Sequence, residues 1–251
     1  MRRRLSENLK RVKERIQAAC ERSRRSAESV RLVAVTKTVE IDIIRAAIES
    51  GLSDIGENRV QPLVKRASMI EEHLRRRRAI DSVTVPQNPS WHMIGHLQRN
   101  KIRKLLPWVD VIHSVDSLRL AEEISAEASK IGKTVKGMIE VNVSGEKSKF
   151  GVAVGAVQHL AQHIVDLPGL EIIGLMTMAP FVDDPEDARG HFRRLQEVAA
   201  DMKTEGVVGP AFRELSMGMT NDFEIAIEEG ATMIRIGRAL FEGLTPAETT
   251  N

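Results

Sequence analysis

The chain has 251 residues, and its 37 basic and 35 acidic side chains leave a formal net charge of only +2. This balance excludes binding to a polyanion through net charge alone. No stretch approaches the length of apolar sequence that a membrane span needs, and the single cysteine, Cys20, excludes an internal disulfide. A lone cysteine suits a reducing compartment, so we expect a cytoplasmic protein without a membrane partner.

Three clusters of arginine, at residues 2–4, 22–25 and 75–78, stand out from this mixed charge. Aromatic residues are not interleaved with them, and no nucleic-acid-binding motif surrounds them. We interpret the clusters as solvated faces of helices and expect no nucleic-acid partner.

The first element predicted along the chain is an amphipathic helix over residues 1–26, because Leu5, Leu9, Val12 and Ile16 recur at helical spacing. Short apolar runs then alternate with helical patterns. The runs predict eight strands, at Leu32–Thr36, Leu52–Ile55, Trp91–Ile94, Val109–His113, Val135–Val143, Leu170–Met176, Phe212–Ser216 and Thr232–Ile236.

Several of these strands are apolar almost continuously, which is typical of parallel strands covered by helices on both faces. Eight such units in a chain of this length predict an α/β fold, a single (β/α)8 TIM barrel with an extra N-terminal helix. An open, doubly wound sheet is the alternative. Without a linker or a break in composition, residues 1–251 are expected to form one domain with a frayed tail at 245–251.

Lys37 follows the first predicted strand directly. The carboxyl ends of barrel strands share one face, and that face carries the functional site. A lysine amine is a nucleophile for aldehydes, and desolvation at the mouth of the core would leave more of it in the neutral, reactive form. A solvated charge at the rim is the alternative interpretation.

The loops after the last two predicted strands, at residues 216–222 and 237–240, are candidates for a phosphate site. Barrels frequently bind phosphate with these two loops. Ser216 and Thr220 offer hydroxyl donors, and the backbone amides of Gly237 and Arg238 begin a helix there. A glycine after a strand is also compatible with a simple tight turn.

Arg235 interrupts an otherwise apolar strand and shares its face with Gly237, two residues later. An arginine inside a barrel mouth needs a partner, which is either a carboxylate or the ring nitrogen of a bound cofactor. A guanidinium donates and cannot accept, so such a nitrogen would stay unprotonated and the ring would be a weaker electron sink. A lysine amine beside a phosphate site suits a phosphorylated aldehyde, of which pyridoxal 5'-phosphate (PLP) is the commonest.

Six motifs follow one another along the chain. They are Ala34–Lys37, Gly56–Asn58, Trp91–Lys101, Gly174–Met178, Ser216–Asp222 and Ile234–Gly237. In this order they resemble the YggS/PROSC family of pyridoxal phosphate homeostasis proteins, and the resemblance extends from Leu5 to Gly243. Arg59 and His96 depart from the family pattern, in which an aromatic residue and a proline are common at these positions.

The resemblance implies a barrel like the N-terminal domain of alanine racemase, with PLP held as an internal aldimine on Lys37. It also implies a carrier or regulator of PLP without established catalysis. The other cofactor-binding residues implied are Ser216, Thr220, Gly237 and Arg238 at the phosphate, Arg235 at the pyridine nitrogen and Asn58 near the ring.

A PLP-dependent amino-acid racemase is the rival function. Racemisation needs an acid/base group on each face of the substrate, and related racemases take the second from a tyrosine on an added domain, whereas this sequence has no tyrosine. His96, His113 or Lys149 are conceivable substitutes, but nothing in the sequence places one opposite Lys37. We therefore expect a PLP-binding monomer that is not an enzyme and has no catalytic residues and no metal site.

Release of the cofactor requires an acceptor and a route out of the site. Apo-PLP enzymes are the expected acceptors. Lys149, in the loop after the fifth predicted strand, is either a solvated charge or a second amine for the cofactor on its way out.

Overall fold

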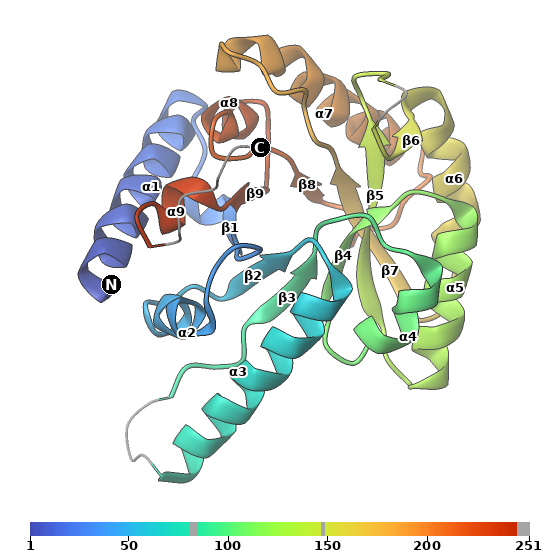
Figure 1. Cartoon of the computed structure of the whole chain (residues 1–251). Coiled ribbons are helices and arrows are strands. Elements are labelled where there is room, and N and C mark those ends of the chain that lie inside the picture. Colours follow the sequence, from blue (N-terminus) through green and yellow to red (C-terminus); the bar gives the residue numbers. More distant parts are fainter. Residues whose placement is uncertain (81–84, 147–148, 245–251) are drawn as a thin grey trace.

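The computed structural model describes residues 1–80, 85–146 and 149–244, so the tail predicted at 245–251 lies outside the described residues. Within them, eight parallel strands close into a barrel with helices outside it (Figure 1). The barrel strands are β1 (Arg31–Val35), β2 (Asp54–Glu57), β3 (Ser90–Met93), β4 (Val111–Val115), β5 (Val135–Asn142), β7 (Leu170–Met176), β8 (Glu214–Ser216) and β9 (Met233–Ile236).

Each strand pairs in parallel with the next along the chain, and the pairing of β9 with β1 closes the ring. A two-residue strand, β6 (Val152–Ala153), pairs only with the end of β5. The helices are α1 (Arg2–Arg22), α2 (Ile41–Glu49), α3 (Val60–Ile80), α4 (Ile102–Leu105), α5 (Leu118–Lys130), α6 (Val157–Ile164), α7 (Arg189–Thr204), α8 (Phe223–Glu228) and α9 (Arg238–Phe241). The predicted (β/α)8 barrel with a leading helix is confirmed, and the open sheet is excluded.

Four barrel strands begin later than predicted: β2, β4 and β8 by two residues each, and β9 by one. Leu52 and Val109 were expected to open β2 and β4, but their N–H groups bond back to the preceding helical turns, Leu52 to the Ala47 carbonyl and Val109 to the Leu105 carbonyl. They are apolar residues that cap the ends of α2 and α4. Because of this shift, Glu57 belongs to β2 itself and is fully buried.

The leading helix is shorter than the predicted 1–26. After Arg22 the Ser23 hydroxyl donates to the Ala19 carbonyl at 2.9 Å, and Arg24 adopts a φ of 55° that ends the helical path. A short 3-10 turn at Ala27–Ser29 then leads into β1.

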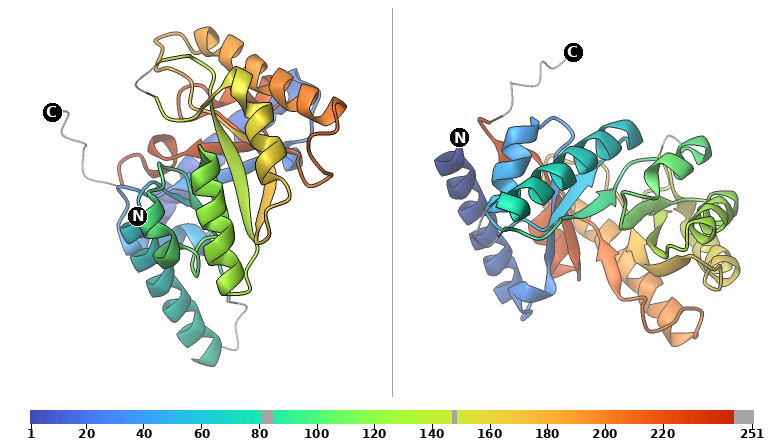
Figure 2. Two further views of the ribbon diagram at one scale, coloured as in Figure 1. Left: turned by 90° about the vertical axis from the view of Figure 1, so that its right-hand side faces the viewer. Right: turned by 90° about the horizontal axis from the view of Figure 1, so that it is seen from below.

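Helix α1 lies beside α8 and α9, so that the two ends of the described chain meet on one side of the barrel (Figures 1 and 2). The buried side chain of Asn8 donates to the carbonyl oxygens of Leu240 and Glu242, both at 3.1 Å. These bonds fasten the first helix to the turn that follows β9.

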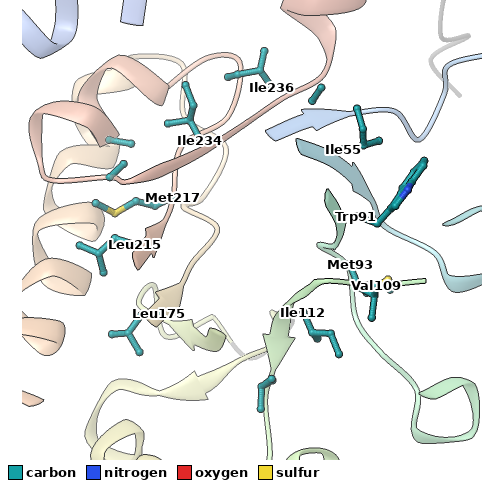
Figure 3. Packing of buried hydrophobic residues seen from close by; sticks show 14 of the residues in the cluster. Ile55, Trp91, Met93, Val109, Ile112, Leu175, Leu215, Met217, Ile234 and Ile236 are labelled. Atoms are coloured by element: carbon teal, nitrogen blue, oxygen red, sulfur yellow. The ribbon is translucent and has the colours of Figure 1, made fainter. Parts of the chain in front are cut away.

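The core has two parts. The larger part fills the space between the strands and the helices, and Figure 3 shows some of its side chains on strands around the barrel. The smaller part comprises Val111, Met138, Ile173, Met176 and Met233. Met233 and Arg235 share one face of β9, so this second cluster and the buried Arg235 both occupy the inside of the barrel.

The arginine clusters lie on the surface, as expected for solvated helix faces. Arg2 pairs with Glu49 at 2.6 Å, and Arg22 pairs with Glu228 at 2.6 Å. Both arginine side chains are more than half exposed, and exposed ion pairs contribute little to stability. No helix within residues 1–80, 85–146 or 149–244 is both long and apolar enough to cross a membrane.

Candidate functional site

Lys37 and Gly237 leave the barrel side by side. Strands β1 and β9 are paired neighbours, with Ala34 opposite Ile236. A Cβ atom at Gly237 would lie 3.3 Å from the Val35 carbonyl oxygen, which shows how closely the end of β9 approaches the end of β1. The structure therefore brings the predicted nucleophile next to the start of the predicted phosphate loop.

The loop that carries Lys37 is stabilised by an ion pair between Glu57 and Arg66, both of which bond to Thr36. Glu57 accepts hydrogen bonds from the Thr36 hydroxyl and from the Arg66 guanidinium. Arg66 also donates to the carbonyl oxygens of Thr36 at 2.7 Å and Val39 at 2.8 Å. Burial raises the pKa of Glu57, although the bonds from Thr36 and Arg66 oppose the shift.

Lys37 itself is exposed, so the expected desolvation of its amine by the barrel mouth is not found. The buried charge near this loop is that of Glu57, and its partner Arg66 is partly buried. Sequence reasoning missed this support because the strand was expected to end at Ile55, before Glu57.

The two predicted phosphate loops lie against each other, since Arg238 reaches the Asn221 side chain at 3.5 Å. The first loop is braced by buried Asp222, which accepts the N–H of Met219 at 2.6 Å. Burial raises the pKa of Asp222 even though that N–H and the charge of Arg235 oppose the rise. Partly buried Thr220 lies on this loop.

Arg235 is buried inside the barrel and donates to the Ser216 hydroxyl at 2.6 Å and to the Thr177 carbonyl oxygen at 2.8 Å. These bonds go to neutral oxygens, so the described residues do not give it the carboxylate salt bridge that was the alternative interpretation. Burial lowers the pKa of Arg235 to about 10, and the nearby carboxylates of Asp222 and Glu140 limit the fall.

The Ser216 hydroxyl is occupied inside the barrel. Besides accepting from Arg235, it lies 2.9 Å from His113 Nδ1. The phosphate role predicted for this hydroxyl stays a prediction that the arrangement does not favour. His113 is also fully buried, which removes it as an acid/base group facing a substrate.

Glu140 is a buried acid that sequence reasoning missed. It lies on β5, two residues before Asn142, and burial together with the charge of Asp116 raises its pKa to about 7, against the opposing charge of Arg235. A sequence signal existed, because Glu140 interrupts an apolar strand and alternation places it on the same face as Asn142.

The loops after β2 and β3 meet at the rim. A Cβ atom at Gly95 would lie 2.4 Å from the Asn58 carbonyl oxygen, so only glycine allows this approach. Asn58 and Arg59 are exposed. His96 lies 3.2 Å from Asp116 and stacks on Phe150, with 4.2 Å between ring centroids.

Lys149 belongs to the same rim through the loop after β5. Its Nζ lies 2.9 Å from Glu146 Oε1, so the amine is held in an ion pair within its own loop. The second-amine role remains a prediction.

Comparisons with known proteins agree over nearly the whole chain. The family described as alanine racemase, N-terminal domain, matches residues 7–246. A pyridoxal phosphate homeostasis protein of Aquifex aeolicus is 42% identical over 235 residues, covering 94% of this chain and 96% of the relative.

Two solved structures extend the likeness to three dimensions. A crystal structure of a protein from Bifidobacterium adolescentis has a TM-score of 0.87 at 43% identity, covering 96% of this chain and 95% of its own. The structure of PipY of Synechococcus elongatus with PLP bound has a TM-score of 0.75 at 31% identity, covering 92% of this chain and 99% of its own.

Proposed function

The chain belongs to the family of pyridoxal phosphate homeostasis proteins, which share the N-terminal domain of alanine racemase, and on this premise we propose that it binds PLP and acts in PLP homeostasis. One observation carries the proposal. Lys37 and Gly237 follow the ends of the neighbouring strands β1 and β9, and this closeness supports an amine and an anion site that share one ligand.

The residues present fit this cofactor. PLP supplies an electrophilic aldehyde when it is bound. On the protein side, Lys37 offers an exposed amine, and Thr220 with the amides of Gly237 and Arg238 offers donors for a phosphate. Arg235 is the proposed donor for the ring nitrogen, and Asn58, exposed at the rim, is the residue proposed near the ring.

The proposed role is that of a carrier, not of an enzyme. Arg235 can only donate, so a ring nitrogen against it stays unprotonated and carbanion chemistry is disfavoured. The sequence has no tyrosine, and the buried position of His113 leaves it no access to a substrate. We infer that residues 1–251 act as one PLP-binding unit, a monomer that delivers the cofactor to apo-enzymes.

A binding measurement tests the proposal. The wild type should keep PLP through gel filtration, and Lys37→Ala should lose it because the covalent link to the amine is gone. Lys10→Ala, which removes an exposed amine on α1, is the control and should behave as the wild type. Equal retention by wild type and Lys37→Ala would contradict the assignment of the lysine.

The racemase alternative has its own test. After prolonged incubation of the PLP-loaded protein with L-alanine, chiral analysis should find no D-alanine above the level that free PLP produces. D-alanine well above that level would contradict the carrier role and show racemase activity.

Delivery is tested by adding an apo-PLP enzyme to the loaded protein and following its recovery of activity. The proposed second amine predicts slower transfer from Lys149→Ala than from the wild type. Equal rates would remove Lys149 from the delivery route.

A further inference from the structure

Five buried or partly buried side chains form a continuous line of hydrogen bonds through the barrel. Asp54 Oδ1 lies 3.1 Å from His92 Nε2, and His92 Nδ1 lies 2.8 Å from His113 Nε2. His113 Nδ1 in turn lies 2.9 Å from Ser216 Oγ, which accepts from Arg235 at 2.6 Å. Strands β4 and β8 are not neighbours in the sheet, so the bond between His113 and Ser216 crosses the barrel interior.

The two ends of this line are chemically fixed. Burial alone would raise the pKa of Asp54, but hydrogen bonds from His92 and Ser53 and the charge of Arg31 outweigh it and hold the pKa below its ordinary value. Asp54 is therefore a carboxylate and only accepts. At the other end Arg235 only donates.

The fixed ends set the direction of every proton between them. Burial and the neighbouring charges hold the pKa of His113 well below its ordinary value, so this ring carries one N–H. When His92 carries a single N–H, the carboxylate of Asp54 takes it from Nε2, and His92 Nδ1 accepts from His113 Nε2–H. His113 Nδ1 then accepts the Ser216 proton, and the serine oxygen is left facing Arg235 as an acceptor.

We propose that Asp54, His92 and His113 are positioning residues, which act through the Ser216 hydroxyl to hold Arg235 in place for the ring nitrogen of the cofactor. The part that concerns the cofactor rests on the proposed function, whereas the proton order is a property of the protein alone.

The proposal predicts that a change at Asp54 moves a proton at His113. Without an acceptor at position 54, a proton on His92 Nε2 would be left as an unpaired buried N–H, so we expect His92 to carry its proton on Nδ1 and donate to His113 Nε2. His113 must then carry its own proton on Nδ1 and donate to Ser216. If His92 and His113 only filled space, the Asp54 substitution would cause small chemical-shift changes but no change of tautomer.

Histidine tautomers can be read directly by long-range ¹H–¹⁵N NMR on ¹⁵N-histidine-labelled, ligand-free protein at pH 8. His92→Gln and His113→Gln assign the signals. In the wild type both rings should be protonated on Nε2, and in Asp54→Leu both should be protonated on Nδ1. Asp54→Asn, which keeps an acceptor oxygen, should match the wild type.

A wild-type His113 protonated on Nδ1, or a His113 tautomer that is the same in the wild type and in Asp54→Leu, would overturn the proposed order. If Asp54→Leu does not fold, the tautomer of His113 in the wild type still tests the proposed proton order. An N–N coupling across the hydrogen bond between His92 Nδ1 and His113 Nε2 is expected, and its absence would contradict the line.

The consequence for the cofactor is measured by titrating the same variants with PLP. The loss of one ordered hydrogen bond should weaken binding by about three- to tenfold in Asp54→Leu, with Asp54→Asn close to the wild type. Equal affinities of Asp54→Leu and the wild type would overturn the positioning role. Failure of the wild type to bind PLP would instead refute the proposed function, while the tautomers would still test the proton order.

Discussion

The charged residues near the mouth of the barrel differ in the solvent exposure of their side chains. Lys37 is exposed, whereas Arg235 and Glu140 are almost fully buried. The amine can therefore meet a ligand from solution, while the buried guanidinium is held by Ser216 and Thr177. A ligand bound at Lys37 would therefore meet an Arg235 side chain whose position is already fixed by hydrogen bonds.

Glu140 makes the stability of the fold depend on pH. Burial raises its pKa from 4.5 to about 7, so the folded state binds this proton more tightly than the unfolded state does. The free energy of unfolding should therefore fall as the pH rises from about 5 to 8, by at most about 3 kcal/mol from this group. Urea unfolding should show a smaller fall for Glu140→Gln than for the wild type.

The control for this prediction is Glu171→Gln, which changes an exposed glutamate on the adjacent strand β7. It should follow the wild type at both pH values. Identical pH dependence of Glu140→Gln and the wild type would show that Glu140 does not titrate in this range.

Single residues were predictable where a strand end alone determines their place. Lys37 and Gly237 follow apolar runs, and parallel strands deliver such residues to one face. The partners of His113 were not predictable, because Ser216 lies 103 residues away and on the far side of the barrel. Only the closure of the sheet brings these two together.

At the scale of the elements, hydrophobic runs located every barrel strand but not each boundary. Leu52 and Val109 are apolar because they cap helices, and a run of apolar residues does not distinguish that role from a strand. Strand β6 was missed since two residues carry no periodicity, and its pairing depends on the end of β5.

The loop between β8 and α8 requires glycine at position 218. Gly218 has a φ of +90°, and a Cβ atom there would lie 2.9 Å from the Phe223 Cα. Gly218→Ala should lower the free energy of unfolding by about 1–3 kcal/mol and weaken PLP binding, since it distorts one of the two proposed phosphate loops. Urea unfolding and a PLP titration measure the two effects.

Gly190→Ala is the matched control. Gly190 lies within α7, and a Cβ atom there meets nothing within 4 Å. Alanine favours the helix, so this variant should gain about 0.5–1 kcal/mol and bind PLP as the wild type does. Equal stability of Gly218→Ala and Gly190→Ala would refute the requirement for glycine at position 218.

The molecule as a whole depends on closure between its first and last elements. Strand β9 pairs with β1, and the Asn8 side chain of α1 donates to the carbonyl oxygens of Leu240 in α9 and of Glu242 just after it. The first helix thus supports the segment that carries the second phosphate loop.

Asn8→Ala should cost about 1–3 kcal/mol of unfolding free energy, because two carbonyl groups lose their buried partner. Lys13→Ala, an exposed change on the same helix, should stay within about 0.5 kcal/mol of the wild type. Chemical unfolding compares the two, and equal stabilities would mean that α1 does not secure the end of the chain through Asn8.

PLP binding as proposed depends on one lysine, Lys37, lying beside one anion site. Reduction of the PLP-loaded protein with borohydride, followed by peptide mass mapping, tests this directly. We predict that the reduced cofactor is found on Lys37 and that excess inorganic phosphate slows its loading. A cofactor fixed on another lysine, or no reducible adduct at all, would contradict the account.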